Sequence, residues 1–87
     1  MTLNELRIEI DAVDDEIAPL LARRMSLSTQ AAAIKRETGA PVLQPERERA
    51  ILYRLSAEME PQFQPALRAI YEAIFRASRE LQEDLIL

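Results

Sequence analysis

The sequence predicts an all-α protein with three helices, and three observations support this prediction. The chain is rich in Ala, Leu, Glu, Arg and Ile, which all favour helix. No segment alternates apolar and polar residues as a strand would. Gly39 with Pro41, and then Pro45, Pro61 and Pro65, divide the chain into three stretches. We expect helices at about residues 3–38, 45–60 and 62–84, within a single domain over residues 1–87.

The first predicted helix is unusually long for so short a chain. At 1.5 Å per residue it would extend about 50 Å. Its apolar residues fall at the a and d positions of a heptad repeat, namely Leu3, Leu6, Ile10, Val13, Ile17, Leu20, Leu27, Ala31 and Ile34. Pro19 predicts a local bend, but the repeat continues in phase across it, which favours one bent helix. Such a helix needs a partner along much of its length, so we expect an oligomer.

The second and third predicted helices each have an apolar face. Pro45 suits the first helical position, and Glu46 suits the positive end of the helix dipole. The apolar residues of the second helix are Ile51, Leu52, Leu55 and Met59, and those of the third are Leu67, Tyr71, Ile74, Leu81 and Leu85, with Ile70 beside them.

Composition excludes several classes of function. The chain contains no cysteine and no histidine, which excludes disulfides, thiolate metal sites and a histidine base. Its net charge of −4 argues against a general nucleic-acid binder. The N-terminus lacks the features of a signal peptide, and no apolar run is long enough to span a bilayer. We therefore expect a cytoplasmic protein without membrane or nucleic-acid partners.

Six polar residues interrupt the apolar stripes of the predicted helices. Arg24 occupies the heptad position otherwise held by Leu3, Ile10 and Ile17, and Lys35 follows about three turns later on nearly the same face. The others are Arg47, Glu48, Ser78 and Gln82. A lone arginine in such a seam usually extends its head to solvent or pairs with an acid that sets the register. Six interruptions together predict a polar pocket inside a helical bundle.

The charges of this predicted pocket indicate its ligand. Three cations face one carboxylate, and an excess of buried positive charge requires an anion. Arginine binds carboxylates with two hydrogen bonds, and lysine supplies a compact donor. No nucleophile is paired with a base, so the pocket suits electrostatic stabilisation and positioning of a small polyanion. The residues alone do not name that ligand.

These residues also carry a family resemblance. The chain resembles the AroQ class of all-helical, type II chorismate mutases in the stretches LNELRIEIDAVDDEIAPLLARRMSLS, AAAIKRETGAPVLQPERERAIL and AIYEAIFRASRELQ. The resemblance implies an intertwined homodimer of three-helix chains and the cofactor-free Claisen rearrangement of chorismate to prephenate, in aromatic amino-acid biosynthesis.

The resemblance also implies a role for each site residue. Arg7, reaching across the dimer, and Arg24 would hold the substrate carboxylates. Lys35 would contact a carboxylate and the ether oxygen, and Gln82 would donate to that oxygen. The remaining implied roles belong to Glu48, which would accept from the ring hydroxyl, to Ser78, which would support a carboxylate, and to Arg47, which would order the site.

One residue departs from the family pattern and leaves alternatives open. Gln44 stands where well-known members have an aspartate near the ring hydroxyl. A mutase of 4-amino-4-deoxychorismate is therefore an alternative, and an isochorismate-pyruvate lyase is a more remote one. An alternative of another class is a non-catalytic dimerisation module, which would place acids beside Arg24 and Lys35. The sequence leaves open whether the chain acts alone or belongs to a fusion.

Overall fold

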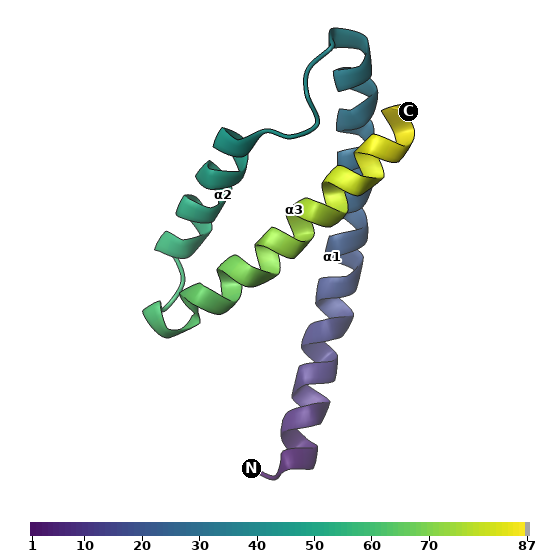
Figure 1. Cartoon of the computed structure of the whole chain (residues 1–87). Helices are drawn as coiled ribbons and strands as arrows, with labels where there is room; N and C mark the ends of the chain where they lie inside the picture. The colour runs from purple at the N-terminus through teal and green to yellow at the C-terminus, as the bar shows by residue number, and fades with distance from the viewer. Residues whose placement is uncertain (87) are drawn as a thin grey trace.

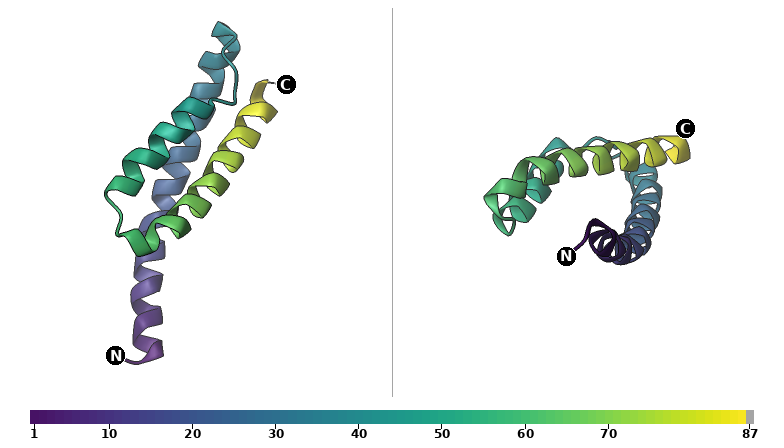
Figure 2. Two further views of the ribbon diagram at one scale, coloured as in Figure 1. Left: turned by 60° about the vertical axis from the view of Figure 1, so that its left-hand side comes forward. Right: turned by 90° about the horizontal axis from the view of Figure 1, so that it is seen from below.

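The computed structural model describes residues 1–86, which form three α-helices and one short 3₁₀ helix (Figure 1). They are α1 (Leu3–Thr38), α2 (Pro45–Ala57), η1 (Pro61–Phe63) and α3 (Gln64–Ile86). The all-α prediction is confirmed, and α1 has the predicted bounds. Helix α3 packs against the C-terminal half of α1 and against α2, while the N-terminal half of α1 projects beyond both (Figure 2).

Both ends of α1 are set by local sequence. The Thr2 hydroxyl accepts a hydrogen bond from the Glu5 amide at 3.1 Å, which caps the first turn. The helix continues unbroken through Pro19, as predicted. It ends at Gly39, whose φ of 76° is left-handed and whose N–H donates to the Lys35 carbonyl at 2.8 Å.

The junction between α2 and α3 differs from the prediction. Helix α2 ends at Ala57 instead of residue 60, because Pro61 forces Glu60 into an extended conformation with ψ of 139°. Residues 61–63 form a 3₁₀ turn, so α3 begins at Gln64 and not at residue 62. The Gln64 side chain donates to the carbonyls of Ser56 and Met59, at 2.9 and 3.3 Å, and so ties the two helices together. At its C-terminal end α3 extends to Ile86, beyond the predicted residue 84.

The hydrophobic core within residues 1–86 is small. Its buried apolar residues are Ala32, Ile51 and Phe75, with exposed fractions of 1%, 7% and 4%. The predicted stripe of α3 omits Phe75, which is buried, and includes Leu85, which is exposed, as is Ile70 beside the stripe. The face of α3 that packs inward is instead centred on Phe75 and on two polar residues, Ser78 and Gln82.

Much apolar surface of this chain is uncovered. Its accessible surface is 6923 Å², whereas a compact monomer of this mass exposes about 5,200 Å². The radius of gyration is 15.9 Å, against about 12 Å for a compact domain of this length. The exposed large apolar residues include most of the heptad stripe of α1: Leu3, Leu6, Ile10, Val13, Ile17, Leu20, Leu27 and Ile34. Even so, none of the helices within residues 1–86 is long and apolar enough to cross a membrane.

Substitution of Gly39 by alanine should destabilise the fold through backbone strain alone. A Cβ at this position would meet nothing within 4 Å. The left-handed φ, however, should cost about 1 kcal/mol of unfolding free energy. Urea unfolding at one fixed protein concentration measures this loss. Gly39→Asn is the matched control and should lose less, since asparagine tolerates this conformation; equal stability of Gly39→Ala and wild type would contradict the argument.

Candidate active site

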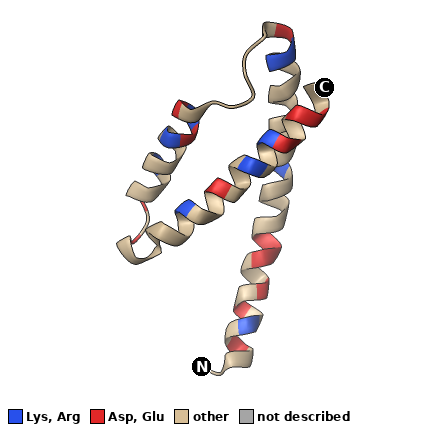
Figure 3. Ribbon diagram, in the orientation of Figure 1, with Lys and Arg blue, Asp and Glu red and all other residues tan. Residues whose placement is uncertain are grey.

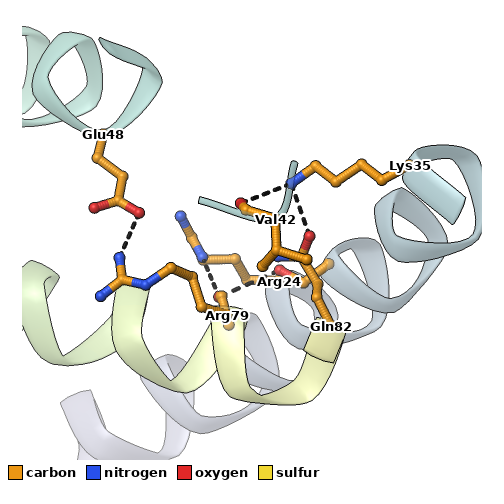
Figure 4. Close-up of polar contacts among 8 residues, drawn as sticks. Arg24, Lys35, Val42, Glu48, Arg79 and Gln82 are labelled. Atoms are coloured by element: carbon orange, nitrogen blue, oxygen red, sulfur yellow. Dashed lines mark hydrogen bonds and ion pairs between the residues drawn. The ribbon is translucent and has the colours of Figure 1, made fainter. Parts of the chain in front are cut away.

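A cavity of about 520 Å³ lies between the three α-helices, where the predicted polar pocket was expected. It brings together seven of the eight predicted site residues: Arg24, Lys35, Gln44, Arg47, Glu48, Ser78 and Gln82. Leu27, Ala31, Val42, Ile51 and Phe75 form its apolar walls. Figure 4 shows charged side chains from all three helices pointing toward one another: Arg24 and Lys35 of α1, Glu48 of α2 and Arg79 of α3.

Lys35 and Gln82 form one polar contact across the seam between α1 and α3. The Lys35 ammonium donates to Gln82 Oε1 at 2.7 Å and to the Val42 carbonyl at 3.3 Å (Figure 4). These two bonds use two of the three lysine donors. Because Oε1 of Gln82 accepts from Lys35, its Nε2 is the atom that can donate elsewhere. Each of the two residues therefore keeps a donor for a ligand.

Arg24 and Ser78 form the second contact across that seam. Arg24 Nη1 donates to the Ser78 hydroxyl at 2.9 Å, and the Ser28 hydroxyl donates to the same oxygen at 3.2 Å. The Ser78 oxygen accepts twice, so its own hydrogen remains available to an acceptor in the pocket. The Arg24 guanidinium also lies 5.9 and 5.8 Å from the ring centroids of Tyr71 and Phe75, within the range of cation–π attraction.

Glu48 of α2 is paired with a residue that the sequence interpretation missed. Arg79 of α3 donates from Nη1 to Glu48 Oε2 at 2.5 Å, and both side chains line the cavity (Figure 4). The spacing of Arg79 and Gln82, three positions apart on one helix, could have revealed it, because residues at this spacing share a side. Arg79 raises the number of cations lining the cavity to four, against the single carboxylate of Glu48.

Gln44 and Arg47 lie at the α2 side of the cavity. Gln44 is the residue before α2, and its Nε2 donates to the Pro41 carbonyl at 3.1 Å rather than capping the helix. Arg47 lines the cavity but is exposed to solvent. Both residues therefore border the pocket.

Arg7 does not line the cavity of its own chain. It is exposed on the N-terminal half of α1, at about 25 Å along the helix axis from Arg24. Its surroundings are acidic (Figure 3), and it is the only Lys or Arg before Arg23. Within one chain, Arg7 is therefore separate from the pocket.

The arrangement suits an anionic ligand and disfavours a purely structural role. A dimerisation module would place acids beside Arg24 and Lys35, but their hydrogen-bond partners within residues 1–86 are neutral: Ser78, Gln82 and Val42. Unneutralised cations in a partly apolar cavity favour a ligand with several negative charges. The cavity offers cations that suit carboxylates, and Lys35 and Gln82 each keep a further donor.

Comparison with known proteins gives one consistent family. The family model described as chorismate mutase type II matches residues 6–83. A T-protein of Haemophilus influenzae is 45% identical over 64% of this chain, and a bifunctional chorismate mutase/prephenate dehydratase of Aquifex aeolicus is 39% identical over 95%. A chorismate mutase of Methanocaldococcus jannaschii is 43% identical over 61% of this chain. The chain spans 15%, 24% and 54% of the lengths of these three relatives, respectively.

Removal of the Ser78 hydroxyl should weaken the seam between α1 and α3. Ser78 is buried, and Ser78→Ala deprives Arg24 and Ser28 of their shared acceptor. We expect the free energy of unfolding to fall by about 1 kcal/mol, as measured by urea denaturation. Ser26→Ala, at an exposed position of α1, is the matched control and should show no loss. If Ser78→Ala unfolds at the same urea midpoint as the wild-type protein, this contact contributes nothing to the free energy of unfolding.

Proposed function

The chain belongs to the type II chorismate mutase family, and on that basis we propose that it converts chorismate to prephenate. The family match over residues 6–83 and the excess of cations in one cavity support this proposal. In the reaction the ether C–O bond breaks while a C–C bond forms within the same molecule. No proton is transferred and no cofactor is required. We further propose that residues 1–87 act as one mutase domain in the cytoplasm.

The two carboxylates of chorismate are proposed to bind the cationic side of the pocket. Arg24 is the central cation, because Ser78, Tyr71 and Phe75 hold its guanidinium in place. The free hydrogen of Ser78 donates to a carboxylate, and Arg47 at the cavity edge orders the site. Binding both carboxylates in fixed positions selects the compact conformer in which the reacting carbons are close.

Lys35 and Gln82 are proposed to act on the ether oxygen, where negative charge develops as its bond to carbon breaks. The 2.7 Å contact between Lys35 and Gln82 Oε1 leaves another lysine N–H and the Gln82 Nε2 group free to donate, and both are proposed to donate to the ether oxygen. Donors fixed before the reaction stabilise the transition state more than the substrate, because no reorganisation is needed. Lys35 also contacts one of the carboxylates, and Glu48 accepts a hydrogen bond from the ring hydroxyl.

A homodimer is proposed to complete the site. The accessible surface of the chain, 6923 Å², exceeds that expected of a compact monomer by roughly 1,700 Å². This excess is in the range that each subunit of an obligate dimer buries. An antiparallel pairing of α1 with a two-fold axis near residues 15 and 16 would set Arg7 opposite Arg24 of the partner subunit. That axis falls inside the exposed heptad stripe, so Arg7 would supply a further cation for a substrate carboxylate.

The first test is direct turnover. Purified protein mixed with chorismate should consume it, as followed by the loss of its ultraviolet absorbance, and the product should be identified as prephenate. Arg24→Ala should lose most of this activity, whereas Arg23→Ala, an exposed neighbour on α1, should retain it. Absence of any conversion by the wild-type protein would overturn the proposed function.

Substitution of Gln82 tests the donor to the ether oxygen. Gln82→Ala should lower kcat by about 100-fold or more while the helical content is unchanged, since loss of one preorganised donor typically has this effect. In Gln82→Glu the side chain donates only when protonated, so activity should rise as the pH is lowered. If Gln82→Ala keeps the wild-type kcat, Gln82 does not donate to the ether oxygen and this proposed role is wrong.

Mixed dimers test the origin of Arg7. Arg7→Ala and Arg24→Ala should each be inactive, but co-expression should restore about one quarter of wild-type activity. Half of randomly formed dimers are mixed, and each mixed dimer has one intact site only if Arg7 acts on the partner subunit. No restoration, with mixed dimers verified by differential tags, would mean that Arg7 does not act across the interface.

A further inference from the structure

We propose that Arg79 is a positioning residue that holds Glu48 in the orientation needed to accept the hydrogen bond of the substrate hydroxyl. This inference rests on the proposed mutase function. It also concerns specificity, because the pair of Arg79 and Glu48 would set the charge that meets the substituent at that ring position. Three observations on the pocket support it: its charge inventory, the geometry of the ion pair and the chemistry of the substrate.

Glu48 requires a fixed partner because it is surrounded by competing cations. It is the only carboxylate among the residues that line the cavity. Arg47 is its neighbour on α2, and Arg24 lines the same cavity. If Glu48 were free, it could pair with either guanidinium and withdraw that guanidinium from the substrate carboxylates. The ion pair with Arg79 directs Glu48 to α3 instead.

The geometry of the ion pair leaves one of the two carboxylate oxygens of Glu48 available. Arg79 Nη1 contacts Oε2 of Glu48, so Oε1 can accept from a ligand (Figure 4). The two side chains are 27% and 24% exposed, so the pair is only partly screened by solvent. Arg79 itself lies on the turn of α3 between Ser78 and Gln82, the two polar residues buried in the seam. Its backbone position is therefore fixed by the packing that builds the pocket.

The substrate has one group that matches this acceptor. Chorismate is a dianion with two carboxylates, an enol ether and one hydroxyl, so the hydroxyl is its only O–H donor. An ionised carboxylate accepts hydrogen bonds and donates none, which makes Glu48 the complementary group of the cavity. Arg79 balances the charge of Glu48, and Gln44, which lines the same cavity, is neutral. The pocket therefore favours a neutral hydroxyl over an ammonium group, against the 4-amino alternative that Gln44 left open in the sequence.

A double-mutant cycle tests whether Arg79 acts through Glu48. Arg79→Gln should lower kcat/KM for chorismate by about tenfold or more, whereas the same change in a Glu48→Gln background should alter it by less than about twofold. Arg76→Gln is the matched control, because Arg76 is an exposed arginine one turn earlier on α3 and does not line the cavity. It should leave kcat/KM unchanged. Circular dichroism and the oligomeric state confirm that each variant is folded.

A change in selectivity distinguishes positioning from a structural role. In Arg79→Gln the ratio of kcat/KM for 4-amino-4-deoxychorismate to that for chorismate should rise at least about tenfold, because an ammonium group could replace Arg79 as the cationic partner of Glu48 and a neutral hydroxyl could not. Arg79→Lys, which keeps the charge without the planar guanidinium, should restore part of the wild-type rate and ratio. If Arg79→Gln does not fold, Arg79→Lys replaces it in the double-mutant cycle. Its loss of kcat/KM should likewise be smaller in the Glu48→Gln background than in the wild-type background.

The outcomes separate this inference from the proposed function. If the wild-type protein converts chorismate but the losses from Arg79→Gln and Glu48→Gln multiply, Arg79 acts independently of Glu48 and the positioning role is wrong. An unchanged substrate ratio in a folded Arg79→Gln variant would overturn the specificity role. If the wild-type protein does not convert chorismate, the proposed function and the role of Arg79 both fall.

Discussion

The seam between α1 and α3 is the contact on which the rest of this structure depends. Its most buried side chains on α3 include Ser78 and Gln82, which accept hydrogen bonds from Arg24 and Lys35 of α1. These bonds satisfy the cations without neutralising them, since the acceptors carry no charge. The same contacts therefore hold two helices together and keep positive charge available to a ligand. Helix α2 then closes the cavity through Glu48.

The cost of this arrangement is visible in the small core. A chain of 87 residues has few positions to bury, and two of the five that are buried within residues 1–86, Ser78 and Gln82, are polar. Packing apolar residues at Ser78 and Gln82 would add hydrophobic stabilisation but would remove the acceptors that orient Arg24 and Lys35. The compensation that we propose comes from association, because the long apolar stripe of α1 offers each chain a second and larger core.

Chemistry that needs neither proton transfer nor a covalent intermediate can be carried by such a pocket. The demands on the protein are fixed positions for two carboxylates and fixed donors at the oxygen of the breaking bond. Rigid helices meet these demands better than loops, and all but one of the predicted pocket residues lie within helices, Gln44 being the exception. The second subunit and Arg79 extend the same principle, since each would supply a cation whose place is fixed by helix packing.

The sequence by itself determined the helical class and the bounds of α1, because helix breakers and heptad repeats are local and periodic features. The six polar interruptions of the apolar stripes also line one cavity, whereas Gln44 and Arg7 were proposed from the family resemblance. The prediction for the junction at Pro61 was wrong, because α2 ends before residue 60 and a 3₁₀ turn at residues 61–63 precedes α3. The sequence interpretation also missed Arg79, which looks like an ordinary surface arginine until α2 brings Glu48 beside it. Only the tertiary structure decided which side of α3 faces inward and which acid meets which cation, since these depend on the rotation of one helix against another. That rotation is set by contacts between residues far apart in the chain, which no local pattern encodes.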